Sequence, residues 1–425
     1  MEKRSGESRE VGLALSELGA RWSLASTVRT RLLGWYAEHR RHLPWRSDDP
    51  EPYVVWVSEI MLQQTRVFAV LGYFQRWMEA LPTVKDLAEA DMELVNQLWS
   101  GLGYYRRARM LHEGAKFVVE NFSGVIPDDV TALRSIPGVG EYTAGAIASI
   151  AFGRPEPAVD GNVTRVLSRL TAIEKFPKAD LWATARSLVT DLEDGIHPGD
   201  VNQALFDLGA TLCTPRAPTC DSCPLIKLCS VHQLALEKNV EDQTEFVTRF
   251  PSKKPKARVR DEILLVEVLH HHQTGDMLMV RRANQGLLGG LWEFPNVVVD
   301  GEEKDEKAIS LAREMLRNNI CEILVGSRAD QIKYSGRVGT TTHIFSHIRQ
   351  KLLVECGTWQ VSSASFSSSV EDGLGYRWVK AEDVTSLAIS NQMLKVFKLK
   401  ISVNETGVDI SEPVKPTKTK RRRKL

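Results

Sequence analysis

Long apolar runs are absent from this chain of 425 residues. No stretch reaches the roughly 18 consecutive apolar residues that a membrane-spanning helix needs, so we expect no membrane segment. The opening MEKRSGESREVG has no apolar centre, and we therefore expect no secretory signal. The chain also has no large excess of positive or negative residues, because the formal net charge is only +1. Any nucleic-acid-binding surface must then be local, since the chain as a whole is not basic.

Cysteine is scarce, and its few copies are unevenly placed. Of six cysteines, two stand alone and have no assigned role, Cys321 and Cys356. The other four lie within LCTPRAPTCDSCPLIKLC: Cys213, Cys220, Cys223 and Cys229. A disulfide framework would spread its cysteines and favour a small secreted chain. The cluster instead indicates a metal site in a reducing compartment, and the local spacing fits a structural zinc or a [4Fe–4S] cluster equally well.

The hydrophobic pattern divides the chain into two halves. Residues 1–26 are polar and are predicted to be disordered. Residues 27–238 carry apolar side chains at spacings of three and four, which predicts an all-helical domain with a cysteine loop at 213–229. Residues 239–258 are charged and read as a linker, and residues 259–402 alternate strand patterns with a helix near KAISLAREMLRNN. The tail at 403–425 ends in KRRRKL and is predicted to be a disordered basic segment.

A glycine-rich break between two helical segments occurs in LRSIPGVGEYTAGAIAS, residues 133–149. Gly138 and Gly140 can both adopt the positive φ that such a turn requires. The helix that starts near Glu141 has free amides in its first turn, and these favour a nearby phosphate. An ordinary helix–turn–helix corner explains the glycines equally well. Further along, the loop FGRPEPAVDGN places Asp160 at the start of another helix, where an N-cap is the simplest role.

These features occur together in an order that resembles the helix–hairpin–helix–GPD superfamily of DNA glycosylases. The cysteine spacing, Cys-x6-Cys-x2-Cys-x5-Cys, is similar to the cluster loop of its endonuclease III and MutY branches. Further motifs resemble the MutY-type adenine DNA glycosylases over residues 28–235: HLPWR (42–46), VSEIMLQQTRV (57–67), GLGYYRRAR (101–109), IPGVGEYTAGAIAS (136–149), AVDGNV (158–163) and LFDLGATLCTPRAPTC (205–220). The resemblance favours a [4Fe–4S] cluster over zinc.

The resemblance also implies a chemistry for specific residues. Glu59 would donate a proton to adenine N7, because apolar neighbours raise the pKa of a carboxyl. Asp160 would stay ionised at the helix start and stabilise the positive charge on the sugar, with Asn162 bound to it or to the attacking water. Tyr142 would bond to the aspartate side of the site. Strand-cutting members have a lysine at the position of Tyr142, and tyrosine cannot form their Schiff base, so we expect removal of the base alone.

DNA contacts are implied at further positions. An adenine must leave the duplex to reach the acids, and wedge side chains fill the gap. Gln64, Leu102 and Tyr104 match the wedge positions of the family. Trp45 and Arg46 match positions that line the extruded base. Phosphate contacts are expected from the amides of the hairpin residues Val139 and Gly140.

The second half resembles the MutT-like C-terminal domain of the same family, a relative of Nudix hydrolases, through MLMVRRANQGLLGGLWEFPNVVV. Its helix LAREMLRNN has Arg317, Asn318 and Asn319 where Mg²⁺-binding acids would stand, so we expect no hydrolase activity. The loop HIFSHI presents Phe345, Ser346 and His347, which match the segment that contacts 8-oxoguanine, although a polar turn is an alternative. The fold class predicted is thus an all-α helix–hairpin–helix domain with an iron–sulfur loop, followed by an α+β Nudix-like domain.

The expected substrate is duplex DNA with adenine opposite 8-oxoguanine or guanine. We expect a monomer, no membrane association and, from the basic tail, a nuclear protein, with an organelle as an alternative. The repair or replication partners are not indicated. Three rivals are a bifunctional glycosylase/lyase, which Tyr142 opposes, a non-catalytic iron–sulfur DNA-binding protein, which Glu59 and Asp160 oppose, and a nucleotide hydrolase, which the missing acids oppose.

Overall fold

The computed structural model describes residues 24–252, 259–283, 286–303, 305–324, 328–360 and 375–406. The chain clusters into two units, of which the first comprises Met1–Ala90 and Met110–Pro255 and the second Asp91–Arg109 and Lys256–Leu425. The predicted terminal tails fall mostly outside the described residues, at 1–23 and 407–425, and so does part of the predicted linker, at 253–258.

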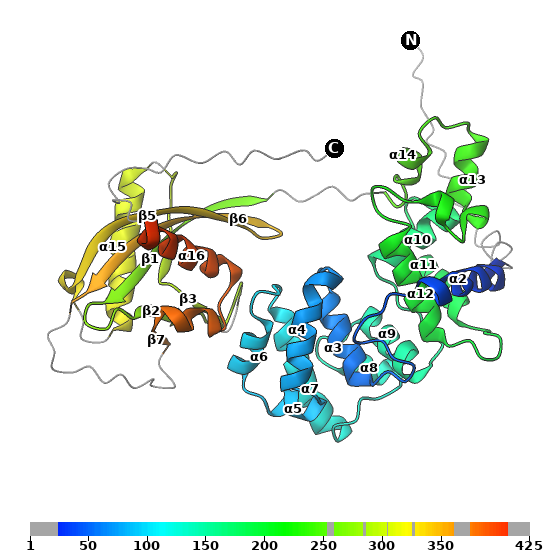
Figure 1. Ribbon diagram of the computed structural model, residues 1–425, viewed down its shortest axis with the longest axis horizontal. Helices are drawn as coiled ribbons and strands as arrows, with labels where there is room; N and C mark the ends of the chain where they lie inside the picture. Colours follow the sequence, from blue (N-terminus) through cyan, green and yellow to red (C-terminus); the bar gives the residue numbers. More distant parts are fainter. Residues whose placement is uncertain are drawn as a thin grey trace, which may run out of the picture. The chain divides into compact units, whose positions relative to one another are not determined.

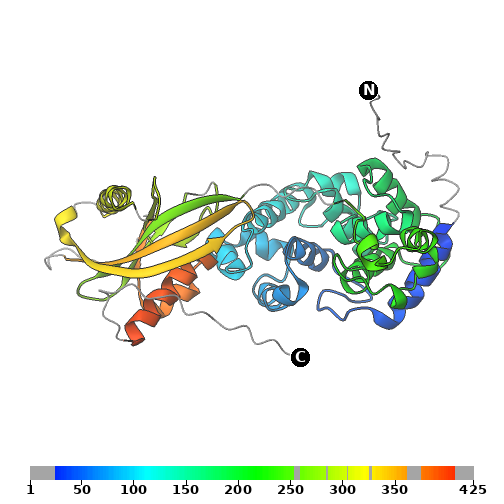
Figure 2. The same ribbon diagram turned by 90° about the horizontal axis from the view of Figure 1, so that it is seen from above.

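In the described residues of the first unit, all regular secondary structure is helical, as the hydrophobic pattern predicts (Figures 1 and 2). Its longer helices pack around a core that contains the fully buried indoles of Trp56 and Trp77. The helices are α2 (Ala25–His39), α3 (Pro52–Leu62), α4 (Val67–Ala80), α5 (Val84–Glu89), α7 (Arg106–Phe122), α8 (Val130–Ser135), α9 (Glu141–Phe152), α10 (Gly161–Thr171), α11 (Lys178–Val189), α12 (Pro198–Thr211), α13 (Ser230–Glu237) and α14 (Gln243–Val247). Among them, none is long and apolar enough to span a membrane, and the same holds for the described helices of the second unit.

Helix α9 lies at the centre of this unit, because it is apolar on every side. All of residues 143–150 are buried, and the helix packs against both α3 and α12. A helix that is hydrophobic all round belongs in a core. The small residues in TAGAIAS allow close approach: a Cβ on Gly145 would lie 2.1 Å from the Pro157 carbonyl oxygen. This packing brings the start of α9 beside α3, and thereby brings the glycine hairpin to the site.

The glycine hairpin uses only one of its glycines for a left-handed turn. Gly138 has a φ of +82°, whereas Gly140 has a φ of −90° and acts as the N-cap of α9. Our expectation of positive φ at both positions was wrong for Gly140. The turn closes when the amide of Val139 donates to the carbonyl of Ile136 at 3.0 Å. The amide of Val139 therefore has a partner within the turn, and its predicted phosphate contact stays a prediction.

The end of the first unit contains the cysteine loop and a short extra helix. The loop has two 3₁₀ turns, η2 (Cys220–Ser222) and η3 (Ile226–Leu228), before α13. Helix α14 forms within the segment predicted as a linker, capped by Asp242, and buries Phe246 and Val247 against α13. Two adjacent apolar residues were too weak a signal to predict this docking from the sequence.

The second unit is built on a mixed sheet (Figure 1), which confirms the α+β class predicted for this half of the chain. The strand order is β3-β2-β1-β6-β5, with β4 paired to β1 and β7 paired to β2. Strands β1 and β6 are parallel, with Leu265 beside Leu353, and β5 and β6 form a long antiparallel hairpin. The strands are β1 (Arg260–His271), β2 (Met277–Arg281), β3 (Trp292–Glu293), β4 (Asn296–Val298), β5 (Ile332–Ile344), β6 (Ile348–Trp359) and β7 (Tyr376–Val379).

Helix α15 (Glu306–Ile323) covers one face of this sheet with an apolar stripe. Ile309, Ala312, Leu316 and Ile320 recur at spacings of three and four and are buried in one cluster with sheet residues such as Leu265. The helix predicted near KAISLAREMLRNN is therefore confirmed. The remaining described helices of this unit are α6 (Met92–Trp99), η4 (Ala329–Gln331), η5 (Ala381–Ser386) and α16 (Asn391–Thr406). Glu93 of α6 accepts hydrogen bonds from Trp292 and Arg377, which is why residues 91–109 group with this unit.

Candidate active site

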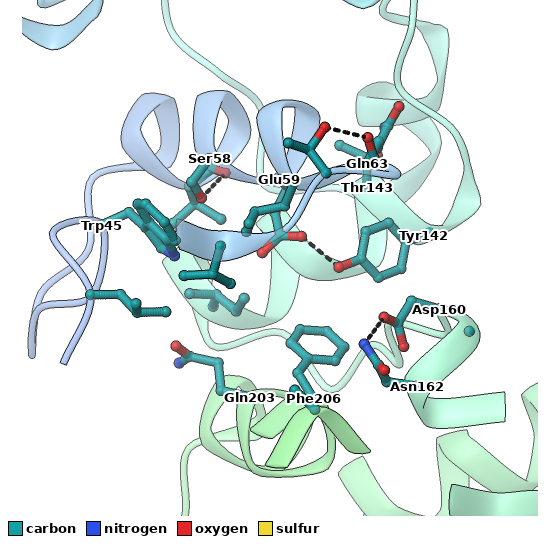
Figure 3. A pocket seen from close by; sticks show the side chains of 18 of the residues that line it. Trp45, Ser58, Glu59, Gln63, Tyr142, Thr143, Asp160, Asn162, Gln203 and Phe206 are labelled. Atoms are coloured by element: carbon teal, nitrogen blue, oxygen red, sulfur yellow. Dashed lines mark hydrogen bonds between the residues drawn. The ribbon is translucent and has the colours of Figure 1, made fainter. Parts of the chain in front are cut away.

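A cavity of about 930 Å³ in the first unit brings together the predicted catalytic residues (Figure 3). Its volume is typical of sites that enclose a small organic group. The residues that line it include all four predicted catalytic positions: Glu59 of α3, Tyr142 of α9, Asp160 at the start of α10, and Asn162. Residues more than 100 positions apart in sequence thus face one space, which the sequence predicted only through its resemblance to a family.

Glu59 lies in the middle of α3 and is almost fully buried, with 6% of its surface exposed. Burial raises the pKa of Glu59 to about 7, and the nearby charge of Asp160 acts in the same direction. The hydrogen bond from Tyr142 and the charge of Arg46 lower the pKa, but burial outweighs them. A carboxyl with a pKa near neutrality can hold a proton and release it to a bound group, as a general acid does.

Tyr142 contacts Glu59 rather than Asp160, which corrects our expectation. Its hydroxyl donates to Oε2 of Glu59 at 2.5 Å, and the dashed line in Figure 3 marks this bond. Burial, together with the charges of Glu59 and Asp160, raises the pKa of Tyr142 well above its ordinary value, so its phenol stays protonated. The first turn of α9 directs the ring at α3, where the buried carboxyl is the acceptor that needs a donor.

Asp160 is the N-cap of α10, and its side chain has two donors. The amide of Val163 donates to Oδ1 at 2.7 Å, and Nδ2 of Asn162 donates to Oδ2 at 2.8 Å. The predicted pairing of Asn162 with Asp160 is therefore present (Figure 3). Burial nevertheless raises the pKa of Asp160 above its ordinary value, although both hydrogen bonds oppose this shift. The helix start favours the anion as expected, but it does not outweigh desolvation.

Helix α10 connects this aspartate to the cysteine loop through arginines. Arg165 donates from Nη2 to Oδ1 of Asn162 at 2.8 Å and from Nε to the carbonyl of Cys213 at 2.7 Å. Arg169, which is buried, donates to Sγ of Cys213 at 3.3 Å. A positive charge at this distance stabilises a thiolate.

The four clustered cysteines are partly buried thiols and form no disulfide. Burial, together with the neighbouring thiols, raises the pKa of Cys223 to about 12 and that of Cys229 to about 11. The thiols thus lie close enough to repel one another once ionised, a cost that a bound cationic centre removes. This donor set fits a thiolate-ligated centre. Among the described residues, however, no His, Cys, Asp and Glu side chains are already arranged in a closed metal-binding group.

The predicted DNA-contacting residues of the first unit lie at the cavity, with one exception. Trp45, Arg46, Gln64 and Gly140 all line it, and Val139 does not. Trp45 is 5% exposed and packs edge-on against Phe74, with ring centroids 5.1 Å apart. Gln64 has a φ of +56°, a left-handed conformation that few non-glycine residues adopt.

The other predicted contact residues belong to the second unit. Leu102 is buried, whereas Tyr104 is 47% exposed and has a φ of +50°. Phe345, Ser346 and His347 form the tip of the β5–β6 hairpin, where the amide of Phe345 donates to the carbonyl of Ile348. Ser346 and His347 are exposed, so their polar atoms are available to a ligand.

Helix α15 lacks the acidic surface of a Nudix hydrolase. Arg313 forms a two-point ion pair with Glu355 of β6, at 2.8 and 2.7 Å, and Glu314 points to solvent. Glu267 of β1 lies near the same arginine; it is 2% exposed, and burial raises its pKa to about 7. A buried, protonatable carboxyl beside arginines is a poor ligand for Mg²⁺.

Helix α12 contributes cavity residues that our sequence analysis did not single out. Gln203, Phe206 and Ala210 line the cavity, and Figure 3 shows the first two below Tyr142. Their spacing of three and four in NQALFDLGA would have placed them on one helix face. Asp207, one turn of α12 after Gln203, is completely buried and forms ion pairs with Arg41 and Arg46.

Two protein families match the chain, one in each half of the sequence. Residues 57–189 match the HhH-GPD superfamily of base excision DNA repair proteins, and residues 266–399 match the NUDIX domain.

Three curated relatives are each named adenine DNA glycosylase. The Arabidopsis thaliana protein is 40% identical over 87% of this chain, which spans 63% of that relative. The Homo sapiens protein is 39% identical over 88% of this chain and 74% of its own length. The Schizosaccharomyces pombe protein is 34% identical over 93% of this chain and 94% of its own length. With identity and coverage of this extent, and with the cavity described above, the chain belongs to the adenine DNA glycosylase family.

Proposed function

We propose that this protein is a base-excision repair enzyme that hydrolyses the N-glycosidic bond of adenine opposite 8-oxoguanine or guanine in duplex DNA. It acts as a monomer and does not cut the strand. The observation that carries the proposal is that a carboxyl with a pKa of about 7, Glu59, and a hydrogen-bonded carboxyl, Asp160, line one cavity. Two acids in unlike environments are what glycoside cleavage requires.

The reaction divides between the two acids. The everted adenine enters the cavity beside Trp45, and Glu59 transfers its proton to N7 so that the base leaves as a neutral molecule. Positive charge then develops on the deoxyribose, and the Asp160 carboxylate stabilises it. Asn162 fixes one oxygen of Asp160 through its amide, which leaves the other to Val163 and the reacting sugar. A water molecule then bonds through its oxygen to the anomeric carbon, and the Asp160 carboxylate accepts the proton that the water loses.

Absence of a nucleophilic amine at the hairpin limits the reaction to base removal. Tyr142 occupies the start of α9, and its buried phenol has a pKa well above the ordinary value. A strand-cutting enzyme needs an amine there to form a Schiff base with the sugar. This favours the monofunctional enzyme over the bifunctional rival.

The cysteine loop would hold a [4Fe–4S] cluster through four thiolates: Cys213, Cys220, Cys223 and Cys229. When bound, the cluster neutralises the thiolate charges and fixes the loop. Arg169 would stabilise the Cys213 thiolate through its 3.3 Å contact. The loop then presents a fixed backbone beside α10, the helix that begins at the catalytic aspartate.

The second unit would read the base opposite the adenine. The hairpin tip at residues 345–347 offers the exposed hydroxyl of Ser346, which contacts Nδ1 of His347 at 3.2 Å. A hydroxyl and an imidazole can donate to or accept from the edge that oxidation changes in guanine. The basic tail, with KRRRKL at its end, supports a nuclear location.

A duplex with one adenine opposite 8-oxoguanine tests the proposal. We expect release of free adenine and an intact strand that breaks only after alkali. A strand break before alkali, with an adduct trapped by borohydride, would support the bifunctional rival. If no adenine is released from duplexes containing adenine opposite either 8-oxoguanine or guanine, the proposed activity is rejected.

A further inference from the structure

Asp207 is a charged group at the base of the cavity that does not itself line it. It lies in α12, and none of its surface is exposed. Its carboxylate accepts from Arg46 at 2.7 and 3.0 Å and from Nε and Nη2 of Arg41 at 2.7 and 2.6 Å. The backbone amide of Arg41 adds a further bond at 3.1 Å. A buried carboxylate is stable only with such partners, so Asp207 and the two arginines form one ion-pair cluster.

Arg46 is the residue through which Asp207 affects the groups in the cavity. Its guanidinium lines the cavity that contains Glu59, and its charge lowers the pKa of Glu59. The two-point contact with Asp207 leaves the guanidinium one orientation, as bidentate arginine–carboxylate pairs do. Tyr36 lies on another side of it, with the guanidinium carbon 5.9 Å from the ring centre.

Asp207 also balances charge next to the reaction. Burial alone would raise the pKa of Asp207, but the hydrogen bonds and charge of Arg46, and then those of Arg41, hold it below its ordinary value, so Asp207 is an anion. Without that anion, two guanidiniums would remain beside the cavity uncompensated. They would favour the ionised form of Glu59 and would repel an adenine that has just received a proton, because charges interact strongly where water is excluded.

We propose that Asp207 is a positioning residue that fixes Arg46 at the wall of the base-binding cavity and neutralises its charge, so that Glu59 keeps the proton it donates. The inference rests on the proposed function and adds to it a residue that acts through another. The charged and titratable groups that face Glu59 are Tyr142, Asp160 and Arg46. Those that face Arg46 are Asp207, Tyr36 and Glu59.

The proposal predicts that two variants shift the pKa of Glu59 in opposite directions. In Asp207→Asn the arginines lose their counter-ion, so the pKa of Glu59 should fall, by about one unit. In Arg46→Met the nearest cation is removed, so the pKa of Glu59 should rise. In the double variant the charge is partly rebalanced, so the pKa should lie between the two single variants.

Infrared titration of the free protein measures these shifts without DNA. The carboxyl band of Glu59 is assigned by subtracting the spectrum of Glu59→Gln, and thermal unfolding checks that each variant is folded. Asp200→Asn is the matched control, because Asp200 lies on the same helix and is partly buried, but does not line the cavity. It should leave the Glu59 band unchanged.

Single-turnover release of adenine gives the second readout. Asp207→Asn should lose about tenfold or more in rate at pH 7.5, with its rate recovering as the pH is lowered toward the new pKa of Glu59. An unchanged Glu59 pKa in folded Asp207→Asn would overturn the proposal and leave a purely structural role. If Asp207→Asn does not fold, Arg46→Met decides: a raised pKa supports the proposal, and an unchanged pKa overturns it. If the wild type releases no adenine, the proposed function fails, while the infrared result still tests the link from Asp207 to Glu59.

Discussion

The hydroxyl of Tyr142 donates a 2.5 Å hydrogen bond to Oε2 of Glu59. This bond occupies one oxygen of the proton donor and leaves Oε1 to carry the proton toward the base. It also opposes the effect of burial on the pKa of Glu59, because a donor to a carboxylate stabilises the ionised form. The pKa of Glu59, about 7, is thus a balance between desolvation, which raises it, and Tyr142, which lowers it.

Removal of this bond should shift the pH dependence of the reaction. In Tyr142→Phe the pKa of Glu59 should rise, so the fall in rate on the alkaline side should move to higher pH. The maximum rate should drop about tenfold, because the carboxyl loses its fixed orientation. Single-turnover rates from pH 5 to pH 9 measure both effects. Tyr53→Phe is the control, since this buried hydroxyl bonds to the Leu81 carbonyl away from the cavity; an equal shift in both variants would contradict the assignment.

Glu59→Gln separates the chemical role of the acid from its effect on stability. The variant cannot donate the proton, so adenine release should fall by about 10² or more. The folded pKa of about 7 lies above the ordinary 4.5, so Glu59 disfavours folding increasingly as the pH rises between these values. Glu59→Gln should therefore be stabilised relative to wild type at pH 8, by about 3 kcal/mol or less, and not at pH 4. Urea unfolding at both pH values measures this; equal differences would show that Glu59 is not buried as a neutral acid.

The variant Asp160→Asn separates the negative charge of Asp160 from its role as the N-cap of α10. Asparagine caps a helix about as well as aspartate, so α10 should be retained and the free energy of unfolding should change by about 1 kcal/mol or less. The negative charge is lost, and adenine release should fall by about 10² or more. Asp129→Asn is the control, because Asp129 caps α8 in the same way through the Ala132 amide and should keep full activity. Retained activity in Asp160→Asn would remove the sugar-stabilising role.

Loss of one cysteine should destroy the proposed cluster. Cys220→Ala should lose the brown colour and the sulfur-to-iron absorption of the wild type, and it should melt at a lower temperature because the loop is no longer fixed. Cys321→Ala, in the second unit, should keep both. A colourless wild type that contains zinc on elemental analysis would overturn the iron–sulfur assignment.

Ser346→Ala should weaken recognition of the lesion but leave the chemistry intact. Without the hydroxyl, the rate advantage of adenine opposite 8-oxoguanine over adenine opposite guanine should shrink several-fold, by about 1 kcal/mol. The single-turnover rate on the guanine mispair should stay the same. Ser335→Ala, on strand β5 outside the hairpin tip, serves as the control. An equal loss on both mispairs would point to general DNA binding.

The sequence identified most of the site through motifs that are local in the chain. Glu59, Asp160 and Asn162 could each be named because short segments around them resemble motifs of a known family; local pattern alone gave Asp160 only the role of a helix cap. Tyr142 was named for the right hairpin but given the wrong partner, and Gly140 the wrong φ. Asp207, buried beneath the cavity, was not singled out, since nothing in LFDLGAT distinguishes a counter-ion from a surface charge.

By itself the sequence determined the two-part organisation, the helical and mixed folds, and the residue types available for acid chemistry. These follow from periodicity and composition, which act over a few turns of the chain. Only the tertiary structure decided that Tyr142 faces Glu59, that burial raises the pKa of Asp160 despite its cap, and that Arg46 is held from beneath. Ionisation and hydrogen-bond partners depend on which distant segments exclude water from a group, and that exclusion exists only once α3, α9, α10 and α12 have packed together.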